Sequence, residues 1–229
     1  MPSVVVETRD LARRFGGRWA LARLDLRVEA GERLLVIGAN GSGKTTLLRV
    51  LSTLLTPTKG VLRLFEQDPA QDLFGVRGRV GLVTHSAGLY EDLSSRDNLE
   101  VQARLLGRPV PAGLLERVGL ADRADPVRHY SAGMRKRLSF ALLLHKAPEL
   151  TLLDEPFAQL DPNGMDSVGA LVRTLPGTVI IASHQLERAS ALCDRALLLE
   201  QGLPRWTGPA SQAVDAWRTL HGDHVAPME

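Results

Sequence analysis

The sequence of 229 residues predicts an α/β fold with a mostly parallel core sheet. Apolar runs that are typical of buried strands occur at residues 34–37, 150–153 and 178–183, and helical patterns separate them. Each of these runs leads directly into residues that can bind phosphate or metal. Because open α/β sheets place their ligands at the carboxyl ends of the strands, we expect a single site at that edge of the sheet.

The chain opens with strand patterns at residues 4–6 and 24–28, and the second of these alternates apolar and polar residues. We expect the two strands to belong to an antiparallel sheet that lies on the parallel core. Phe15 and Trp19 stand between them, separated by Gly16 and Gly17.

A glycine-rich motif follows the first buried run. Residues 38–45 match the phosphate-binding P-loop pattern G-x-x-x-x-G-K-[ST], and a helix pattern continues over 46–51. Backbone N–H groups and the helix N-terminus would surround a triphosphate, with Lys44 at the β- and γ-phosphates and the Thr45 hydroxyl on Mg²⁺. The predicted nucleotide-binding residues are Gly38, Asn40, Gly41, Ser42, Gly43, Lys44, Thr45 and Thr46. An aromatic side chain beside such a loop either stacks on adenine or simply packs, and the residues alone leave both possibilities open for Phe15.

The middle of the chain is mostly helical. After strands at 61–65 and 79–84, the second of which ends at His85, a capping-box-like start at Ser94 predicts a helix over about 95–106 that stops at Gly107. Further helices are expected at 112–118 and 135–146. We therefore expect a single domain, 1–229, with an inserted helical subdomain at about 88–146.

Candidate metal-binding and catalytic residues lie in the second half of the chain. Asp154 and Glu155 follow a buried strand, where a P-loop enzyme needs a carboxylate for Mg²⁺. Asp154 is the candidate for the metal, and Glu155 can accept a proton from an attacking water. His184 follows the strand at 178–183 and could donate to the γ-phosphate. A helix begins near Asp161, a strand covers 195–199, and a last helix over 210–220 is expected to turn Val214, Trp217 and Leu220 inward.

Composition excludes several classes of protein. The net charge is +2, which implies no strong field for nucleic acid, and Cys193 is the single cysteine, so no disulfide can form within the chain. The N-terminus lacks the pattern of a signal peptide, and no apolar stretch approaches the ~20 residues that span a bilayer. A role at a membrane would therefore need a separate partner subunit.

Five landmarks occur in order: the P-loop, the Ser131–Gly133 segment, Asp154–Glu155, Leu160–Asp161 and His184. With them the chain resembles the ATP-binding cassette (ABC) family of transporter ATPases over Val4 to about Gly208. The resemblance implies the cassette fold, ATP and Mg²⁺, and a head-to-tail homodimer with ATP at the interface. It also implies an integral-membrane partner and a peripheral location at the cytoplasmic face of the membrane.

The resemblance assigns roles residue by residue. Glu155, His184 and Lys44 would be catalytic, and Thr45 and Asp154 would bind the metal. Phe15 falls where the family has its adenine-stacking aromatic, which favours stacking over packing for that residue. Ser131, Gly133 and Asp161 would approach nucleotide at the dimer interface.

Two positions depart from the family pattern. The signature reads Tyr130-Ser131-Ala132-Gly133-Met134 in place of Leu-Ser-Gly-Gly-Gln, and His85 replaces a glutamine that senses the nucleotide and contacts the membrane subunit. An imidazole is a poorer Mg²⁺ ligand than an amide oxygen, so His85 is expected to act through water or phosphate and to couple ATP to the partner.

His85, the short insert and the small size are similar to the haem-exporter ATPases of cytochrome c maturation. Exporters of drugs, lipids or polysaccharides remain alternatives, as does a soluble ABC ATPase that acts on ribosomes or DNA. The latter is less favoured because the chain has one cassette, no heptad run and a nearly neutral charge. A regulator without hydrolysis is disfavoured by the presence of Glu155 and His184.

Overall fold

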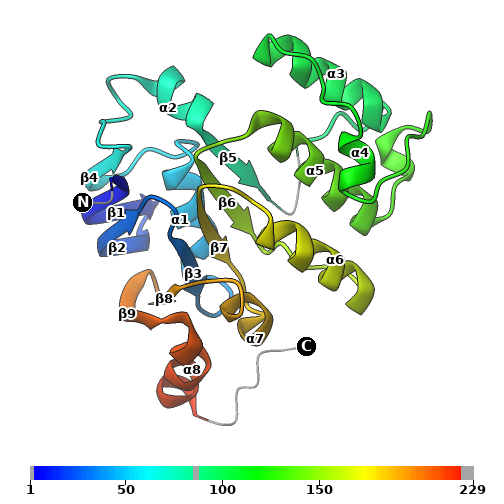
Figure 1. Ribbon diagram of the computed structural model, residues 1–229. Coiled ribbons are helices and arrows are strands. Elements are labelled where there is room, and N and C mark those ends of the chain that lie inside the picture. The colour runs from blue at the N-terminus through cyan, green and yellow to red at the C-terminus, as the bar shows by residue number, and fades with distance from the viewer. Residues whose placement is uncertain (1–2, 85–87, 223–229) are drawn as a thin grey trace.

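The computed structural model describes residues 3–84 and 88–222, which form two sheets and the helices around them (Figure 1). The larger sheet contains six strands in the order β5 (Val80–Val83), β6 (Leu150–Asp154), β7 (Thr178–Ala182), β3 (Arg33–Ile37), β8 (Arg195–Glu200) and β9 (Leu203–Pro209). The first five are parallel, and β9 pairs antiparallel with β8 at the edge. The predicted parallel core is confirmed, whereas the sequence does not predict β9, because this strand contains two prolines and a glycine and none of its residues is buried.

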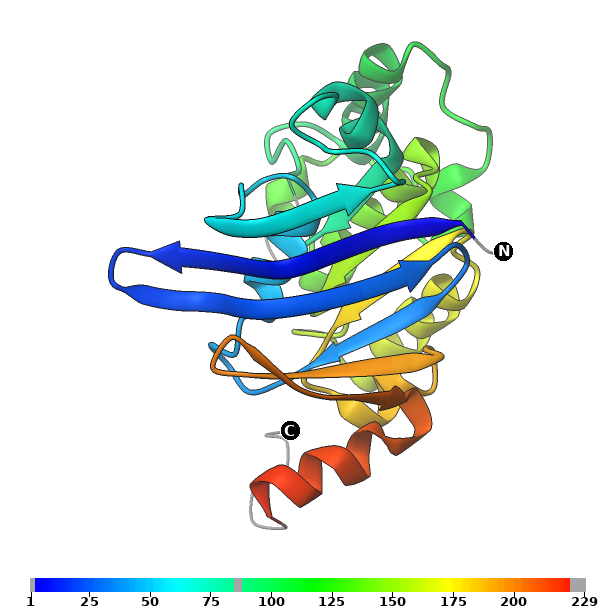
Figure 2. The ribbon, with the colours of Figure 1, turned by 90° about the vertical axis from the view of Figure 1, so that its left-hand side faces the viewer.

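The N-terminal strands form the expected antiparallel sheet, in the order β2 (Arg18–Glu29), β1 (Val4–Phe15) and β4 (Lys59–Leu64). Figure 2 shows the long β1–β2 hairpin crossing in front of the core strands. Both strands extend well beyond the short apolar runs because bulges carry them through polar residues. Helix α1 (Lys44–Leu51) is buried between the two sheets, so the P-loop that begins it is held from both sides.

Helices fill the segment between β5 and β6. The structure contains α3 (Ser95–Leu106), α4 (Leu114–Arg117), a 3₁₀ turn (Val127–His129) and α5 (Ala132–Lys146). The capping box at Ser94 and the left-handed Gly107 bound α3 as predicted. Helix α5 begins three residues earlier than expected because Ser131 caps it. We call residues 95–146 the helical segment.

The remaining helices are α2 (Leu73–Arg79), α6 (Pro162–Arg173), α7 (Leu186–Ser190) and α8 (Ala213–His221), with a 3₁₀ turn at Ala210–Gln212. The sequence did not predict α2 and α7, which are short. Throughout residues 3–84 and 88–222, no helix has both the length and the apolar character that crossing a membrane requires.

The last helix differs from expectation on one face. Trp217 is buried, but Leu220 is 46% exposed, so the prediction that Leu220 turns inward is wrong. Ala213 and Trp217, four residues apart, face the core, and His221 continues that row by stacking on the Trp217 ring at 4.0 Å between centroids. The buried stripe therefore follows i, i+4, i+8 rather than i, i+3, i+6.

We expect Trp217→Ala to lower the free energy of unfolding by about 3–5 kcal/mol, because a large buried side chain leaves a cavity. Leu220→Ala should change it by less than about 0.5 kcal/mol, because the side chain is largely in solvent. Urea unfolding of the two variants beside wild type measures both values, and equal losses would contradict the orientation of α8.

Candidate functional site

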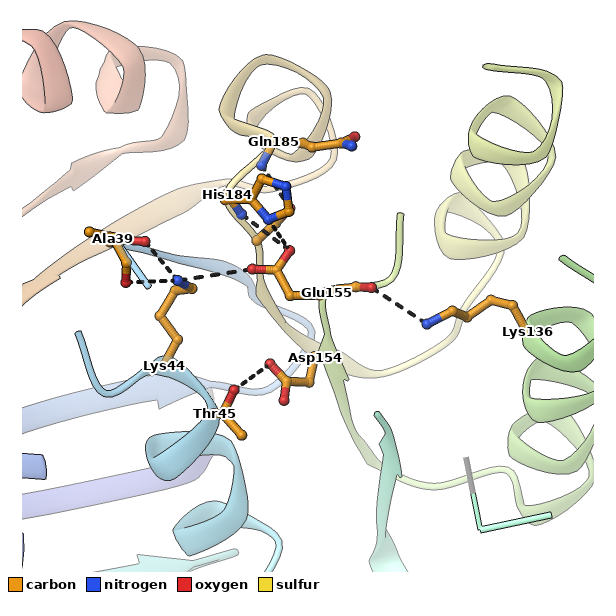
Figure 3. A network of polar contacts seen from close by, with 10 residues as sticks. Ala39, Lys44, Thr45, Lys136, Asp154, Glu155, His184 and Gln185 are labelled. Carbon is orange, nitrogen blue, oxygen red and sulfur yellow. Dashed lines mark hydrogen bonds and ion pairs between the residues drawn. The ribbon is translucent and has the colours of Figure 1, made fainter. Parts of the chain in front are cut away.

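Three neighbouring strand ends create the site. Strand β7 lies between β6 and β3, with Asp154 opposite Ala182 and Ala182 opposite Val36. The backbone bonds continue past the strands: the Glu155 N–H donates to the Ala182 carbonyl at 2.8 Å. The acids, His184 and the P-loop therefore meet at one edge of the sheet, as Figure 3 shows. The predicted convergence is confirmed.

Lys44 is a buried cation at the start of α1. Its Nζ donates to the carbonyl oxygens of Gly38 and Ala39, at 2.7 and 3.2 Å, and lies 3.9 Å from Glu155 Oε1. Burial lowers the pKa of Lys44, whereas the charges of Glu155 and then Asp154 raise it. The loop thus holds a desolvated positive charge at the point where phosphate oxygens are expected.

Thr45 and Asp154 form a pair of oxygen donors. The Thr45 hydroxyl donates to Asp154 Oδ1 at 3.1 Å, and the Asp154 residue is buried. Mg²⁺ prefers hard oxygen ligands and is usually held by one or two carboxylates together with substrate phosphates. The residues present therefore fit the predicted metal, and Thr45 and Asp154 are its candidate protein ligands.

Glu155 and His184 form a second pair. His184 Nδ1 lies 2.7 Å from Glu155 Oε2, and the His184 backbone N–H donates to the same oxygen at 3.3 Å. Glu155 has a φ of 49°, in the left-handed region that residues with a Cβ rarely adopt. The strand-end turn and His184 together fix the direction of this carboxylate, which is what a general base requires.

The other predicted residues lie outside this cluster of contacts. Ser131 Oγ accepts from the Met134 N–H at 3.2 Å and Asp161 Oδ1 from the Gly164 N–H at 2.9 Å, so both serve as helix N-caps. Phe15 is 46% exposed at the tip of the β1–β2 hairpin, with the Arg13 guanidinium 4.7 Å from its ring centroid. Gly133 is half-buried in the first turn of α5, close to the N-cap residue Ser131. His85 lies outside the described residues.

The structure adds Lys136, which the sequence analysis missed. This buried lysine of α5 donates to the Glu155 carbonyl at 3.5 Å. It begins a row of inward residues that continues with Phe140 and Leu143 at i+4 and i+7. A lysine in an otherwise apolar helical stripe was the available signal.

Comparison with known proteins gives consistent matches. A sequence family described as ABC transporter matches residues 21–158. The daunorubicin resistance ATP-binding protein DrrA3 of Streptomyces coeruleorubidus is 42% identical over 88% of this chain and 67% of that protein. The bacitracin transport ATP-binding protein BcrA of Bacillus licheniformis is 32% identical over 87% of this chain and 68% of that protein. The chain thus spans about two thirds of the length of these curated relatives.

The fold also matches solved structures. An ATP-binding subunit of an ABC transporter superposes with a TM-score of 0.82 at 24% identity, covering 97% of this chain and 95% of that one. The match supports the cassette fold, with its antiparallel N-terminal sheet, parallel core and helical insertion.

Two glycines of the P-loop are required for different reasons. Gly38 has a φ of 154°, and a Cβ there would collide with the Leu199 carbonyl oxygen and with Ser42 Oγ. Gly41 has a φ of 78°, but a Cβ there would meet no atom within 4 Å. Gly41 thus lies on the open, exposed part of the loop, and the P-loop prediction expects a phosphate to bind this loop.

We expect Gly38→Ala to lower the free energy of unfolding by about 3 kcal/mol through overpacking. Gly41→Ala should cost about 1 kcal/mol of backbone strain and yet weaken nucleotide binding in a folded protein. Thermal unfolding and titration with a fluorescent ATP analogue separate the two effects. Equal stability losses, or full affinity in Gly41→Ala, would contradict this division of roles.

Proposed function

This chain belongs to the ABC transporter family of ATPases, and we propose that it hydrolyses ATP to drive export through a separate membrane protein. The observation that carries the proposal is the meeting of Lys44, the Thr45–Asp154 pair and the Glu155–His184 pair at one sheet edge. Phosphoryl transfer to water needs charge neutralisation and an oriented nucleophile rather than covalent catalysis. These groups supply both.

Each group has one task in the reaction. Lys44 exchanges its carbonyl partners for oxygens of the β- and γ-phosphates, which compensates the desolvation of its ammonium. Thr45 and Asp154 would hold Mg²⁺, which would supply positive charge next to the phosphates. Glu155 accepts the proton of the attacking water, and a doubly protonated His184 ring donates from Nδ1 to the Glu155 carboxylate and from Nε2 to the γ-phosphate.

A second copy completes the site. The N-terminus of the 15-residue α5 is solvent-facing at Ser131, and a helix N-terminus attracts anions through its free N–H groups and dipole. In the proposed head-to-tail homodimer, Ser131, Gly133 and Asp161 of one copy approach the ATP held by the other. Phe15 stacks on the adenine of its own copy.

The names of two relatives suggest a chemical class for the transported compound. Proteins named for daunorubicin resistance and for bacitracin transport match most of this chain. We therefore propose an amphiphilic, antibiotic-like cargo that is carried by the membrane partner, with this chain peripheral at the cytoplasmic face. The likeness to haem exporters gains no support from these relatives and stays an untested prediction, as does the coupling role of His85.

Glu155→Gln should bind ATP but hydrolyse it about 10²–10⁴-fold more slowly, because the general base is lost. It should also form an ATP-dependent dimer, since the amide removes anionic repulsion at the closed interface. Steady-state phosphate release and gel filtration with ATP measure the two effects. Glu187→Gln, an exposed change on nearby α7, is the control and should behave as wild type. Wild-type turnover by Glu155→Gln would refute the proposed chemistry.

Removing this chain from its host should increase sensitivity to anthracycline- or bacitracin-like compounds and leave haem-stained c-type cytochromes normal. Wild type should restore resistance and Glu155→Gln should not, because export requires hydrolysis. Loss of covalent haem from c-type cytochromes, with unchanged drug sensitivity, would instead establish the haem-export hypothesis. Co-purification of a ribosome rather than a membrane protein would refute both.

A further inference from the structure

Lys136 puts a buried cation behind the candidate catalytic turn. It lies in the second turn of α5, is 7% exposed, and extends toward the Glu155 carbonyl (Figure 3). Burial lowers the pKa of Lys136, whereas the charges of Asp154 and then Glu155 raise it. An ammonium is costly to bury, and its neighbours in the row, Phe140 and Leu143, show that an apolar side chain suits this stripe.

The acceptor of Lys136 belongs to the strained residue of the site. Glu155 has a φ of 49°, and this conformation needs support from its surroundings. Its N–H donates to the Ala182 carbonyl at 2.8 Å, and its carbonyl accepts from the Ala158 N–H at 3.2 Å and from Lys136 Nζ at 3.5 Å. Both backbone groups of the proposed general base are therefore held.

The groups that contact the Glu155 backbone come from two different parts of the fold. Ala182 and Ala158 belong to β7 and to the turn after β6, whereas Lys136 comes from the helical segment. Among the described residues, the Glu155 carbonyl is the one acceptor to which Lys136 Nζ makes a hydrogen bond. Lys136 thus ties the position of α5 to the position of Glu155. The N-terminus of the same helix is the end proposed above to approach the ATP of a second copy.

We propose that Lys136 is a positioning residue for ATP hydrolysis, which holds the Glu155 turn through its carbonyl and makes the carboxylate direction depend on α5. The inference rests on the proposed ATPase function. It assigns to Lys136 no contact with the substrate. Loss of the ammonium then misdirects the base without weakening the binding of ATP.

Lys136→Met keeps an unbranched side chain that is one atom shorter and removes the charge and the donors. In the full chain, kcat for ATP should fall on the order of tenfold, with KM within about twofold of wild type, because small misplacement of a catalytic group lowers the rate of chemistry. Lys136→Arg, which keeps charge and donors, should restore most of kcat. The melting temperature of Lys136→Met should not fall, since a desolvated cation has been removed.

Lys146→Met is the matched control. Lys146 lies on the same helix, burial also lowers its pKa, and its Nζ donates to the carbonyls of Arg77 and Val80 at 2.9 and 2.6 Å, away from Glu155. This variant should keep the wild-type kcat.

Two outcomes overturn the inference. One is a wild-type kcat in Lys136→Met beside an inactive Glu155→Gln, which would leave the proposed function standing. The other is a parallel fall of kcat and melting temperature in both lysine variants, which would make Lys136 structural. A wild-type chain that binds ATP without hydrolysing it would refute the proposed function itself, and the inference with it.

Discussion

The buried ammonium of Lys44 constrains the whole edge of the sheet. A cation with a 7% exposed side chain needs oxygen partners, and the P-loop provides two by turning the carbonyls of Gly38 and Ala39 toward Nζ. That turn is possible because Gly38 has a φ of 154°, where an added Cβ would strike Leu199. Glu155 faces the same ammonium at 3.9 Å, so the positive charge also favours keeping an acid at the end of β6. The conformation of the P-loop, the glycine at position 38 and the acid Glu155 are therefore all linked to the buried ammonium of Lys44.

The order of strands converts separate sequence features into one site. Thr45 of the P-loop and Asp154 are 109 residues apart along the chain, and Glu155 and His184 are 29 apart, but β3, β7 and β6 lie side by side in the sheet. The P-loop follows β3, the acids follow β6 and His184 follows β7, so all three lie at their carboxyl ends. Because β7 is central, the bond from the Glu155 N–H to Ala182 fixes the base relative to the loop that carries His184. Backbone hydrogen bonds between neighbouring strands therefore position the residues of the site, independently of the contacts between their side chains.

How much the sequence predicts depends on the range of the interaction. Long apolar runs and local caps were sufficient for β3, β6, β7 and α3, since burial on both faces and the Ser94 capping box are visible within a few residues. The sequence does not predict the short α2 and α7, whose formation depends on packing against distant elements, or the edge strand β9, which contains two prolines and a glycine. The prediction for Leu220 is wrong because Trp217 fits two helical spacings: with Val214 and Leu220 at i±3, as predicted, or with Ala213 and His221 at i±4, as observed. Lys136 could not be assigned to Glu155, because the contact joins a helix and a strand end that only the fold brings together.

In the proposed homodimer, the signature residues of one copy would complete the site of the other. The contacts around Lys44, Thr45, Asp154, Glu155 and His184 would provide charge, metal ligands and a base within one chain. Ser131 and Asp161 take no part in them, and their side chains instead cap α5 and α6. A cap fixes the helix N-terminus and leaves its remaining N–H groups free to meet an anion from outside. If a second copy supplies that anion, α5 becomes the element that connects it to Lys136 and the Glu155 turn. Assembly would then act on the base through the backbone of Glu155, which makes hydrolysis depend on dimer closure rather than on ATP binding alone.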